Sequence, residues 1–216
     1  MIPYDESSKQ RATNICDSVP GYSGAIHYQF WTNLVAVPDW SSLLMFGVYH
    51  GRDLSMLCEI AGDYPKRQFL FTGVDKFNDK SCADWPDEIK GKTWAEAGLG
   101  KYPDHTTAKA NIEQYRPPTV KLTLCKGDEM EFIATHPFTY DFIYLDTAHD
   151  YDSVCRQVKA VKKLCHPKTI LMGDDYTNKG FPDAPFEVRR AVCDSFTEHT
   201  VFGEWIWVGH SKHIKP

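Results

Sequence analysis

The sequence predicts an α/β protein in which a mostly parallel sheet carries helices on both faces. From Ser41 onward, short continuous apolar runs alternate with stretches whose apolar residues recur at helical spacing. Continuous apolar runs are typical of strands buried on both faces, and parallel strands need helical crossovers between them. A third observation concerns function, because polar residues follow five of the apolar runs directly.

The predicted parallel strands are these five runs: residues 42–48, 68–74, 120–125, 140–145 and 169–172. The C-terminal stretch VFGEWIWVGH is rich in residues that favour strands and is too short for another helical crossover. We therefore expect an antiparallel hairpin or a single antiparallel strand at the edge of the sheet.

Three segments have helical periodicity. In the first, Leu54, Leu57, Cys58 and Ala61 follow the i, i+3, i+4, i+7 pattern. The second covers residues 151–165; acidic residues flank its start, lysines fill its last turn, and a His-Pro pair follows it. The third carries apolar residues at 188, 191, 192 and 196.

Two segments interrupt the alternation within what we expect to be a single domain, residues 1–216. Residues 1–40 contain the aromatic stretch GAIHYQFW, which predicts a helix packed as a cap over one end of the sheet. Residues 77–118 contain Trp85 and Trp94 and are too long for an ordinary connection. They predict a lid or substrate-facing insertion with some helix; the alternative is a solvated insertion without a role.

Composition excludes several classes of protein. The chain has 24 basic and 29 acidic residues, and this balance argues against a nucleic-acid-binding surface. No apolar run approaches the 18 or so residues of a membrane span, and the charged N-terminus does not resemble a secretion signal. Seven cysteines without a C-x-x-C pair predict reduced core thiols in a cytoplasmic protein.

The polar residues after the strands predict a binding site. They are Gly47 to Gly51, Asp75, Gly127 with Asp128, Asp146, and Asp174 with Asp175. A single aspartate after a strand is commonly a helix cap. Five such segments meet, however, at the carboxyl edge of a parallel sheet, which is where open α/β sheets bind ligands.

The glycines after the first strand discriminate between cofactors. A dinucleotide-binding turn needs G-x-G-x-x-G, whereas this chain has only G-x-x-x-G, with the bulky His50 and Arg52 in and next to the turn. This pattern disfavours a nicotinamide-dependent oxidoreductase. It suits a ligand whose ribose and amino-acid tail lie across the turn, with Asp75 accepting hydrogen bonds from the ribose hydroxyls.

The runs LLMFGVYHGRDL, FTGVDKF, KGDEM, YDFIYLDTAHDYDSV, ILMGDDY and FEVRRAV resemble class I S-adenosylmethionine-dependent methyltransferases, in particular small O-methyltransferases. The resemblance implies a Rossmann-like, doubly wound sheet of seven strands with a C-terminal antiparallel strand. It also implies the cofactor contacts: Gly47, Tyr49 and Gly51 along the methionine and ribose, Asp75 on the ribose, Gly127 and Asp128 near the adenine, and Asp146.

The metal-dependent, catechol-type branch of this family supplies the nearest chemical parallel. By that resemblance Asp146, Asp174 and Asp175 would hold a divalent metal, for which carboxylate oxygens favour Mg²⁺. His149 would be the general base toward a hydroxyl of a small-molecule acceptor that is phenolic, sugar-like or a natural product.

Alternatives remain at this point. The family usually has an acidic residue where this chain has Met45, which leaves open a non-catalytic module that binds S-adenosylmethionine. His149 can be a structural residue at a helix start, and Asp174 with Asp175 a capping pair. A nucleic-acid methyltransferase would need a basic face. A homodimer is possible.

Overall fold

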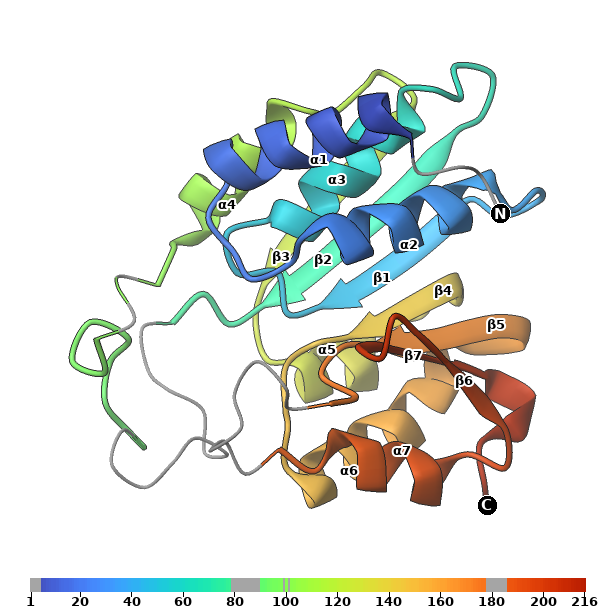
Figure 1. Ribbon diagram of the computed structural model, residues 1–216. Helices are drawn as coiled ribbons and strands as arrows, with labels where there is room; N and C mark the ends of the chain where they lie inside the picture. The colour runs from blue at the N-terminus through green and yellow to red at the C-terminus, as the bar shows by residue number, and fades with distance from the viewer. Residues whose placement is uncertain (1–4, 79–89, 99, 101, 178–185) are drawn as a thin grey trace.

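A computed structural model describes residues 5–78, 90–98, 100, 102–177 and 186–216 of the chain. Seven strands form one sheet, as expected (Figure 1). Their bounds are β1 Ser42–Phe46, β2 Phe69–Asp75, β3 Val120–Lys126, β4 Tyr140–Leu145, β5 Cys165–Gly173, β6 His199–Phe202 and β7 Ile206–His210.

The sheet has the order β3-β2-β1-β4-β5-β7-β6. The first five strands are parallel, whereas β7 is antiparallel to β5 and β6 is antiparallel to β7. The predicted Rossmann-like sheet is thus confirmed, and of the two C-terminal alternatives the antiparallel hairpin is the one present. The direction of winding reverses between β1 and β4, so the crevice at their carboxyl ends is the expected place for a ligand.

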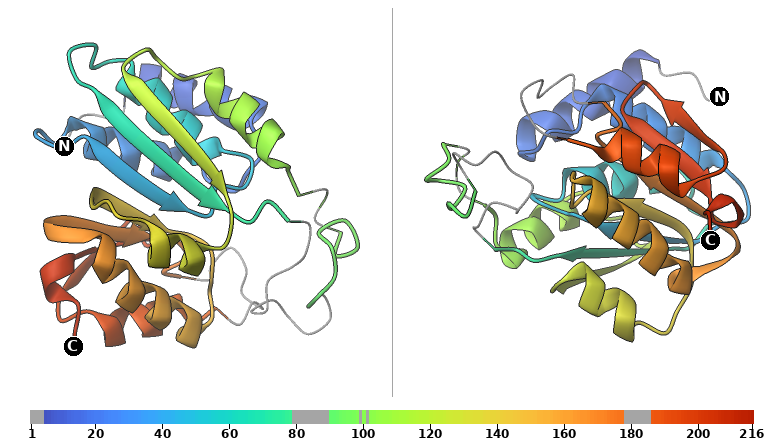
Figure 2. Two further views of the ribbon diagram at one scale, coloured as in Figure 1. Left: turned by 180° about the vertical axis from the view of Figure 1, so that it is seen from behind. Right: turned by 90° about the horizontal axis from the view of Figure 1, so that it is seen from below.

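Seven α-helices cover the two faces of the sheet within the described residues. They are α1 Glu6–Ser18, α2 Ala25–Ala36, α3 Arg52–Ala61, α4 His105–Glu113, α5 Glu129–Thr135, α6 Tyr151–Ala160 and α7 Val188–Ser195. Helices α1 to α4 lie on one face and α5 to α7 on the other (Figure 2). The alternating residues of β1 divide accordingly: Leu43 and Met45 join the first core, and Leu44 and Phe46 the second.

Two predicted boundaries differ from the observed ones near residue 165. Helix α6 ends at Ala160 and a 3₁₀ turn, Val161–Leu164, follows it. Strand β5 then begins at Cys165, four residues earlier than predicted, and its pairing with β4 shifts register between Tyr140 and Phe142. Pro167 lies in this irregular part of the strand, where the missing N–H breaks no regular ladder.

The N-terminal aromatic stretch is helical, as predicted, but it does not cap an end of the sheet. Helix α2 lies across the face, where Trp31 packs edge-on against Tyr144 of β4 at 4.9 Å between ring centroids and Phe30 contacts Phe202 of β6. Its apolar side chains are buried because they form part of the first core.

The cysteines are less buried than predicted. The six that the structure describes are free thiols, but only Cys58 is buried, and Cys193 is exposed. Cys82 lies outside the described residues. No helix in the described part of the chain combines the length and the apolar character that crossing a lipid bilayer requires.

Candidate active site

The five polar segments converge at the carboxyl edge of the sheet. Phe46, the last residue of β1, pairs with Val74 on one side and Leu145 on the other, and Leu145 pairs in turn with Gly173. On the other flank Asp75 pairs with Lys126. The residues that follow these strand ends therefore lie at one edge of the sheet, as the sequence predicts.

The turn from Gly47 to Gly51 needs its glycines for steric reasons. Gly47 has a φ of +82°, and a Cβ added there would lie 1.8 Å from the carbonyl oxygen of Asp146. Gly51, at the start of α3, has a φ of +87°, and a Cβ there would lie 2.6 Å from Ile112. Tyr49 between them adopts a φ of +50°, an uncommon conformation for a side chain of this size. Glycine thus brings the ends of β1 and β4 into contact.

We expect Gly47→Ala to lower the free energy of unfolding by about 1–3 kcal/mol, because the methyl group meets backbone and the left-handed φ adds strain. Urea denaturation measures this. Gly127→Ala is the matched control, since Gly127 has no positive φ and a Cβ there meets open space. Equal stability of the two variants would contradict the steric requirement.

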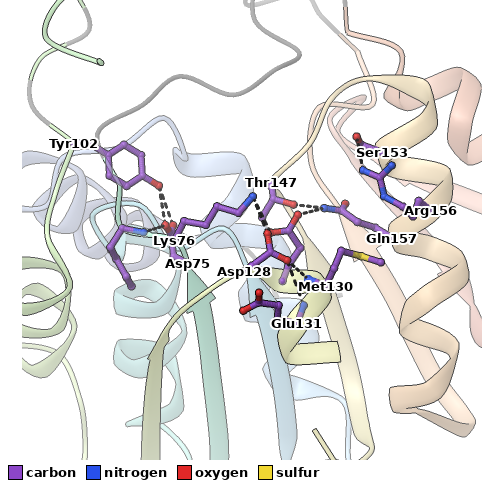
Figure 3. Close-up of polar contacts among 12 residues, drawn as sticks. Asp75, Lys76, Tyr102, Asp128, Met130, Glu131, Thr147, Ser153, Arg156 and Gln157 are labelled. Carbon is purple, nitrogen blue, oxygen red and sulfur yellow. Dashed lines mark hydrogen bonds and ion pairs between the residues drawn. The ribbon is translucent and has the colours of Figure 1, made fainter. Parts of the chain in front are cut away.

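The carboxylate of Asp75 organises the same turn from the end of β2. It is only 6% exposed, and it accepts hydrogen bonds from the backbone N–H groups of Val48 at 2.8 Å, Tyr49 at 2.9 Å and Phe77 at 2.7 Å. The hydroxyl of Tyr102 donates to the same carboxylate, at 3.0 and 2.9 Å from its two oxygens (Figure 3). The position predicted for a ribose hydroxyl therefore holds a tyrosine hydroxyl.

Part of the predicted insertion packs on the glycine turn. The rings of Trp94 and Tyr102 both lie 5.2 Å from that of Tyr49, and 5.0 Å from each other. Helix α4 is the helix expected in this insertion. Trp85 falls outside the described residues. The insertion is thus in contact with the site, whereas a substrate-facing role for it stays a prediction.

Asp128 has the capping role that a lone aspartate after a strand commonly has. Its side chain accepts from the N–H groups of Met130 and Glu131 at the start of α5, and it pairs with Lys76 at 3.1 Å (Figure 3). Partial burial opposes ionisation, but Lys76 and these hydrogen bonds lower the pKa of Asp128 below its usual value. The N–H of Gly127 donates to the carbonyl of Asp75 at 2.9 Å. A contact of either residue with adenine stays a prediction.

Three predicted residues form a compact group beyond β4 and β5. One ligand atom each from Asp146, His149 and Asp175 lies within 4.8 Å of the others. The ring of His149 stacks on Phe186 at 4.2 Å between centroids, and its Nε2 lies 2.9 Å from Oδ2 of Asp175. Burial and the neighbouring carboxylates of Asp174 and Asp175 raise the pKa of Asp146 well above its usual value.

Asp174, the remaining predicted metal ligand, is oriented by a residue that sequence reasoning missed. Its Oδ2 lies 2.7 Å from Nε2 of His27 on α2, and its Oδ1 is buried without a hydrogen-bond partner in the described structure. Burial lowers the pKa of His27 but the bond to Asp174 raises it more strongly, to about 9. The N–H of Gly24, which lies 3.2 Å from Nδ1, opposes that rise because it needs an unprotonated nitrogen.

Comparison with known proteins identifies the family. A family model described as "Methyltransferase domain" matches residues 44–176, more than half of the chain. The chain belongs to this methyltransferase family. The resemblance inferred from the motifs is thereby confirmed. A search of curated protein sequences found no match.

Solved structures support the same fold. The O-methyltransferase NovP has a TM-score of 0.64 at 14% identity, with 87% of this chain and 80% of NovP covered. The calicheamicin methyltransferase CalS11 has a TM-score of 0.55 at 16% identity, covering 95% and 93%. An O-methyltransferase from Bacillus cereus, solved with S-adenosylhomocysteine, has a TM-score of 0.52 at 15% identity, covering 96% and 92%. At these identities the likeness concerns the fold.

The methyltransferase has a pocket of about 380 Å³ next to the Asp146–His149–Asp175 group. Asp175 forms part of its wall together with Tyr176, Phe186, Arg189 and Cys193. Phe186 also stacks on His149, so the pocket adjoins the imidazole ring through this phenylalanine. The wall combines two aromatic rings with charged side chains, a lining that suits a small polar organic molecule.

The side chains of the Asp146–His149–Asp175 group are chemically suited to bind a divalent metal ion. Of the three ligands that the resemblance implies, Asp146 and Asp175 belong to this group and Asp174 precedes Asp175 in the chain, and hard oxygen ligands of this kind suit Mg²⁺. Burial and repulsion by the neighbouring carboxylates both raise the pKa of Asp146, and a bound cation would offset them. The buried Oδ1 of Asp174 is a further acceptor with no partner in the described residues.

Arg52, which follows the glycine turn, binds the N-terminal part of the chain. Its guanidinium donates to the carbonyls of Cys16, Val19 and Ser23, in and after α1. The neighbouring Asp53 accepts from Ser23 and from Trp31 of α2. This Arg-Asp pair therefore ties the N-terminal helices of the methyltransferase to its glycine turn.

Proposed function

We propose that this methyltransferase transfers a methyl group from S-adenosylmethionine to a hydroxyl of a small molecule bound in the pocket beside Asp175, assisted by Mg²⁺. The observation that carries the proposal is the position of His149. It stacks on a wall of the pocket and pairs with Asp175, at the strand edge where the glycine turn and Asp75 lie. This arrangement supports a base and an acceptor pocket at the same strand edge at which the cofactor would bind.

The cofactor would lie across the turn from Gly47 to Gly51. Its ribose hydroxyls would donate to Asp75, taking the place of the Tyr102 hydroxyl. The sulfonium group is cationic, and the carboxylates of Asp146 and Asp174 lie on the side of the crevice toward which it would point, so their charge favours it electrostatically. Met45 lacks a carboxylate, so these residues would have to take the place of the acidic group that the family usually has on β1.

His149 would supply the proton chemistry. The acceptor oxygen attacks the methyl carbon in line with the leaving sulfur; the new C–O bond forms as the C–S bond breaks, and S-adenosylhomocysteine leaves. The hydroxyl proton passes to His149, whose ring is oriented by Asp175 and Phe186. When bound between Asp146 and Asp175, Mg²⁺ would polarise the acceptor oxygen and lower the pKa of its hydroxyl.

Two measurements test this function. Calorimetric titration with S-adenosylhomocysteine is expected to show binding. If the protein bound NAD but not S-adenosylhomocysteine, methyl transfer would be rejected. Methyl transfer to a panel of phenols, catechols and sugars with and without Mg²⁺ tests the acceptor class. Cofactor binding with no turnover on the panel or on a cell extract would favour a non-catalytic binding module.

We expect Tyr102→Phe to tighten binding of S-adenosylhomocysteine about threefold to tenfold, as measured by calorimetry. The variant keeps the ring that packs on Tyr49 but loses the hydroxyl bonds to Asp75 that the ribose must displace, and bonds of this kind contribute roughly 0.5–1.5 kcal/mol. Tyr115→Phe is the control, because it also removes a tyrosine hydroxyl, one that contacts Ser18. Weaker binding by Tyr102→Phe would mean that this hydroxyl contacts the bound cofactor.

A further inference from the structure

We propose that His27 is a positioning residue for the metal site: it holds the Asp174 carboxylate so that Oδ1 faces the ion proposed between Asp146 and Asp175. This inference rests on the proposed function. It assigns a role in the site to the N-terminal helix α2, which lies outside the part of the chain that the family model matches.

The hydrogen-bond pattern of His27 makes it a fixed donor. The side chain is only 7% exposed. Nδ1 lies 3.2 Å from the N–H of Gly24, at the start of the same helix, and Nε2 lies 2.7 Å from Oδ2 of Asp174. In the neutral ring the Gly24 bond places the hydrogen on Nε2, and in the protonated ring Nε2 carries one as well. In both states His27 donates to Asp174.

One carboxylate oxygen of Asp174 consequently has a hydrogen-bond partner and the other has none in the described structure. With Oδ2 held by His27, Oδ1 is buried and has no hydrogen-bond partner among the described residues. A buried carboxylate oxygen without a partner is costly, so a further group bound there would stabilise the arrangement. The neighbouring carboxyl group of Asp146 donates no hydrogen bond to this oxygen in the described structure.

A second unsatisfied atom lies in the same region. Tyr144 of β4 is 1% exposed, and its hydroxyl is buried with no partner in the described structure. The carboxylates of Asp174 and Asp146 are the charges that act most strongly on this hydroxyl. The two atoms without partners are an acceptor, Oδ1 of Asp174, and a donor, the hydroxyl of Tyr144. A hydrated cation would satisfy both, because the ion would bind Asp174 and one of its water molecules would accept from Tyr144.

His27 would act by holding a carboxylate that binds the metal, without binding the metal itself. Groups that hydrogen-bond a ligating carboxylate fix its orientation, and their loss typically weakens metal binding about 10–100-fold. Here the fixing group comes from a helix 147 positions earlier in the sequence than Asp174. The alternative is a purely structural tie between α2 and the end of β5, which would affect unfolding and leave metal affinity unchanged.

The test is Mn²⁺ binding, measured by electron paramagnetic resonance on folded protein saturated with S-adenosylhomocysteine. We expect His27→Ala to weaken Mn²⁺ binding about 10–100-fold. His27→Gln, whose amide nitrogen stands near the position of Nε2, should recover most of the affinity. Tyr28→Phe is the matched control, because it removes another buried bond from α2, the one to Glu59 at 2.5 Å, away from the site.

The outcomes separate this inference from the proposed function. If His27→Ala binds Mn²⁺ as the wild type does, His27 has no positioning role, while the function stands. If the wild type binds S-adenosylhomocysteine but not Mn²⁺, both the metal site and this role are rejected and methyl transfer stands. If His27→Ala does not fold, Mn²⁺ affinity is compared among the wild type, His27→Gln and His27→Asn, since the shorter asparagine cannot reach Asp174. Equal Mn²⁺ affinity of all three proteins would overturn the inference.

Discussion

Replacing His149 by alanine is expected to slow methyl transfer about 10²–10⁴-fold, the range that a positioned general base contributes, while the affinity for S-adenosylhomocysteine stays within about twofold. The imidazole stacks on Phe186 at the wall of the acceptor pocket and pairs with Asp175. The turn and Asp75, which would bind the cofactor, do not depend on it. Steady-state kinetics with saturating cofactor and calorimetry on the same preparation measure the two quantities.

His166→Ala is a closely matched control for this substitution. His166 also pairs with an aspartate, Asp141, at 3.1 Å, but at the opposite end of β4 and β5. Loss of this pair should leave turnover close to that of the wild type. A fully active His149→Ala enzyme would show instead that His149 serves only the structure around the start of α6, where its carbonyl accepts from the N–H of Glu187.

The sequence predicts this site well where the information is local. The parallel strands are rich in apolar residues, and the last residues of each strand and the turn after it are adjacent in the chain. The carboxyl edge of the sheet and the aspartates on it could therefore be placed without coordinates. The hairpin of β6 and β7 was predictable for the same reason, because its strands are short and consecutive.

The directions of individual side chains were not predictable, because distant parts of the chain determine them. Asp174 and Asp175 are adjacent and chemically identical, yet one pairs with His27 of α2 and the other with His149. Only the packing of α2 across the sheet decides between them. The backbone contributes as well, since Asp175 adopts a φ of +56°. A single histidine in an aromatic helix is a weak signal, and core packing was its simplest interpretation.

The contact between Tyr102 and Asp75 illustrates a related limit. The acidic residue at the end of β2 was identifiable from its position, whereas its tyrosine partner lies in the irregular insertion, where no periodic pattern constrains the chain. The start of β5 was missed for a different reason. A His-Pro pair ordinarily ends a helix, but here it belongs to the irregular start of a strand. In this part of the strand the N–H of His166 donates to the Thr169 hydroxyl at 2.8 Å.

Replacing Asp146 by asparagine should separate stability from function. Burial and the carboxylates of Asp174 and Asp175 raise the pKa of Asp146 above its unfolded value, so the folded protein binds the proton more tightly than the unfolded chain does. Stability contributed by this group is therefore present at low pH and is lost as the pH rises through the raised pKa. At neutral pH the uncharged amide removes that penalty, and we expect metal-free Asp146→Asn to be more stable than the wild type. A gain of about 1 kcal/mol would raise Tm by about 2–4 °C.

The same substitution should abolish most of the activity, because it removes one of the three carboxylates proposed to hold Mg²⁺. We expect weaker Mn²⁺ binding, turnover reduced by at least about 10²-fold, and no further response to added Mg²⁺. Asp128→Asn provides the opposite case: the pKa of Asp128 is lowered by Lys76 and by the N–H groups of α5, so its neutralisation should cost stability and leave the metal response intact. Thermal melts of both variants with and without Mg²⁺ distinguish the two behaviours. If the Asp146→Asn enzyme kept its Mg²⁺-dependent activity, the metal would have to bind elsewhere. A neutral amide cannot supply the negative charge that the Asp146 carboxylate contributes to the proposed site.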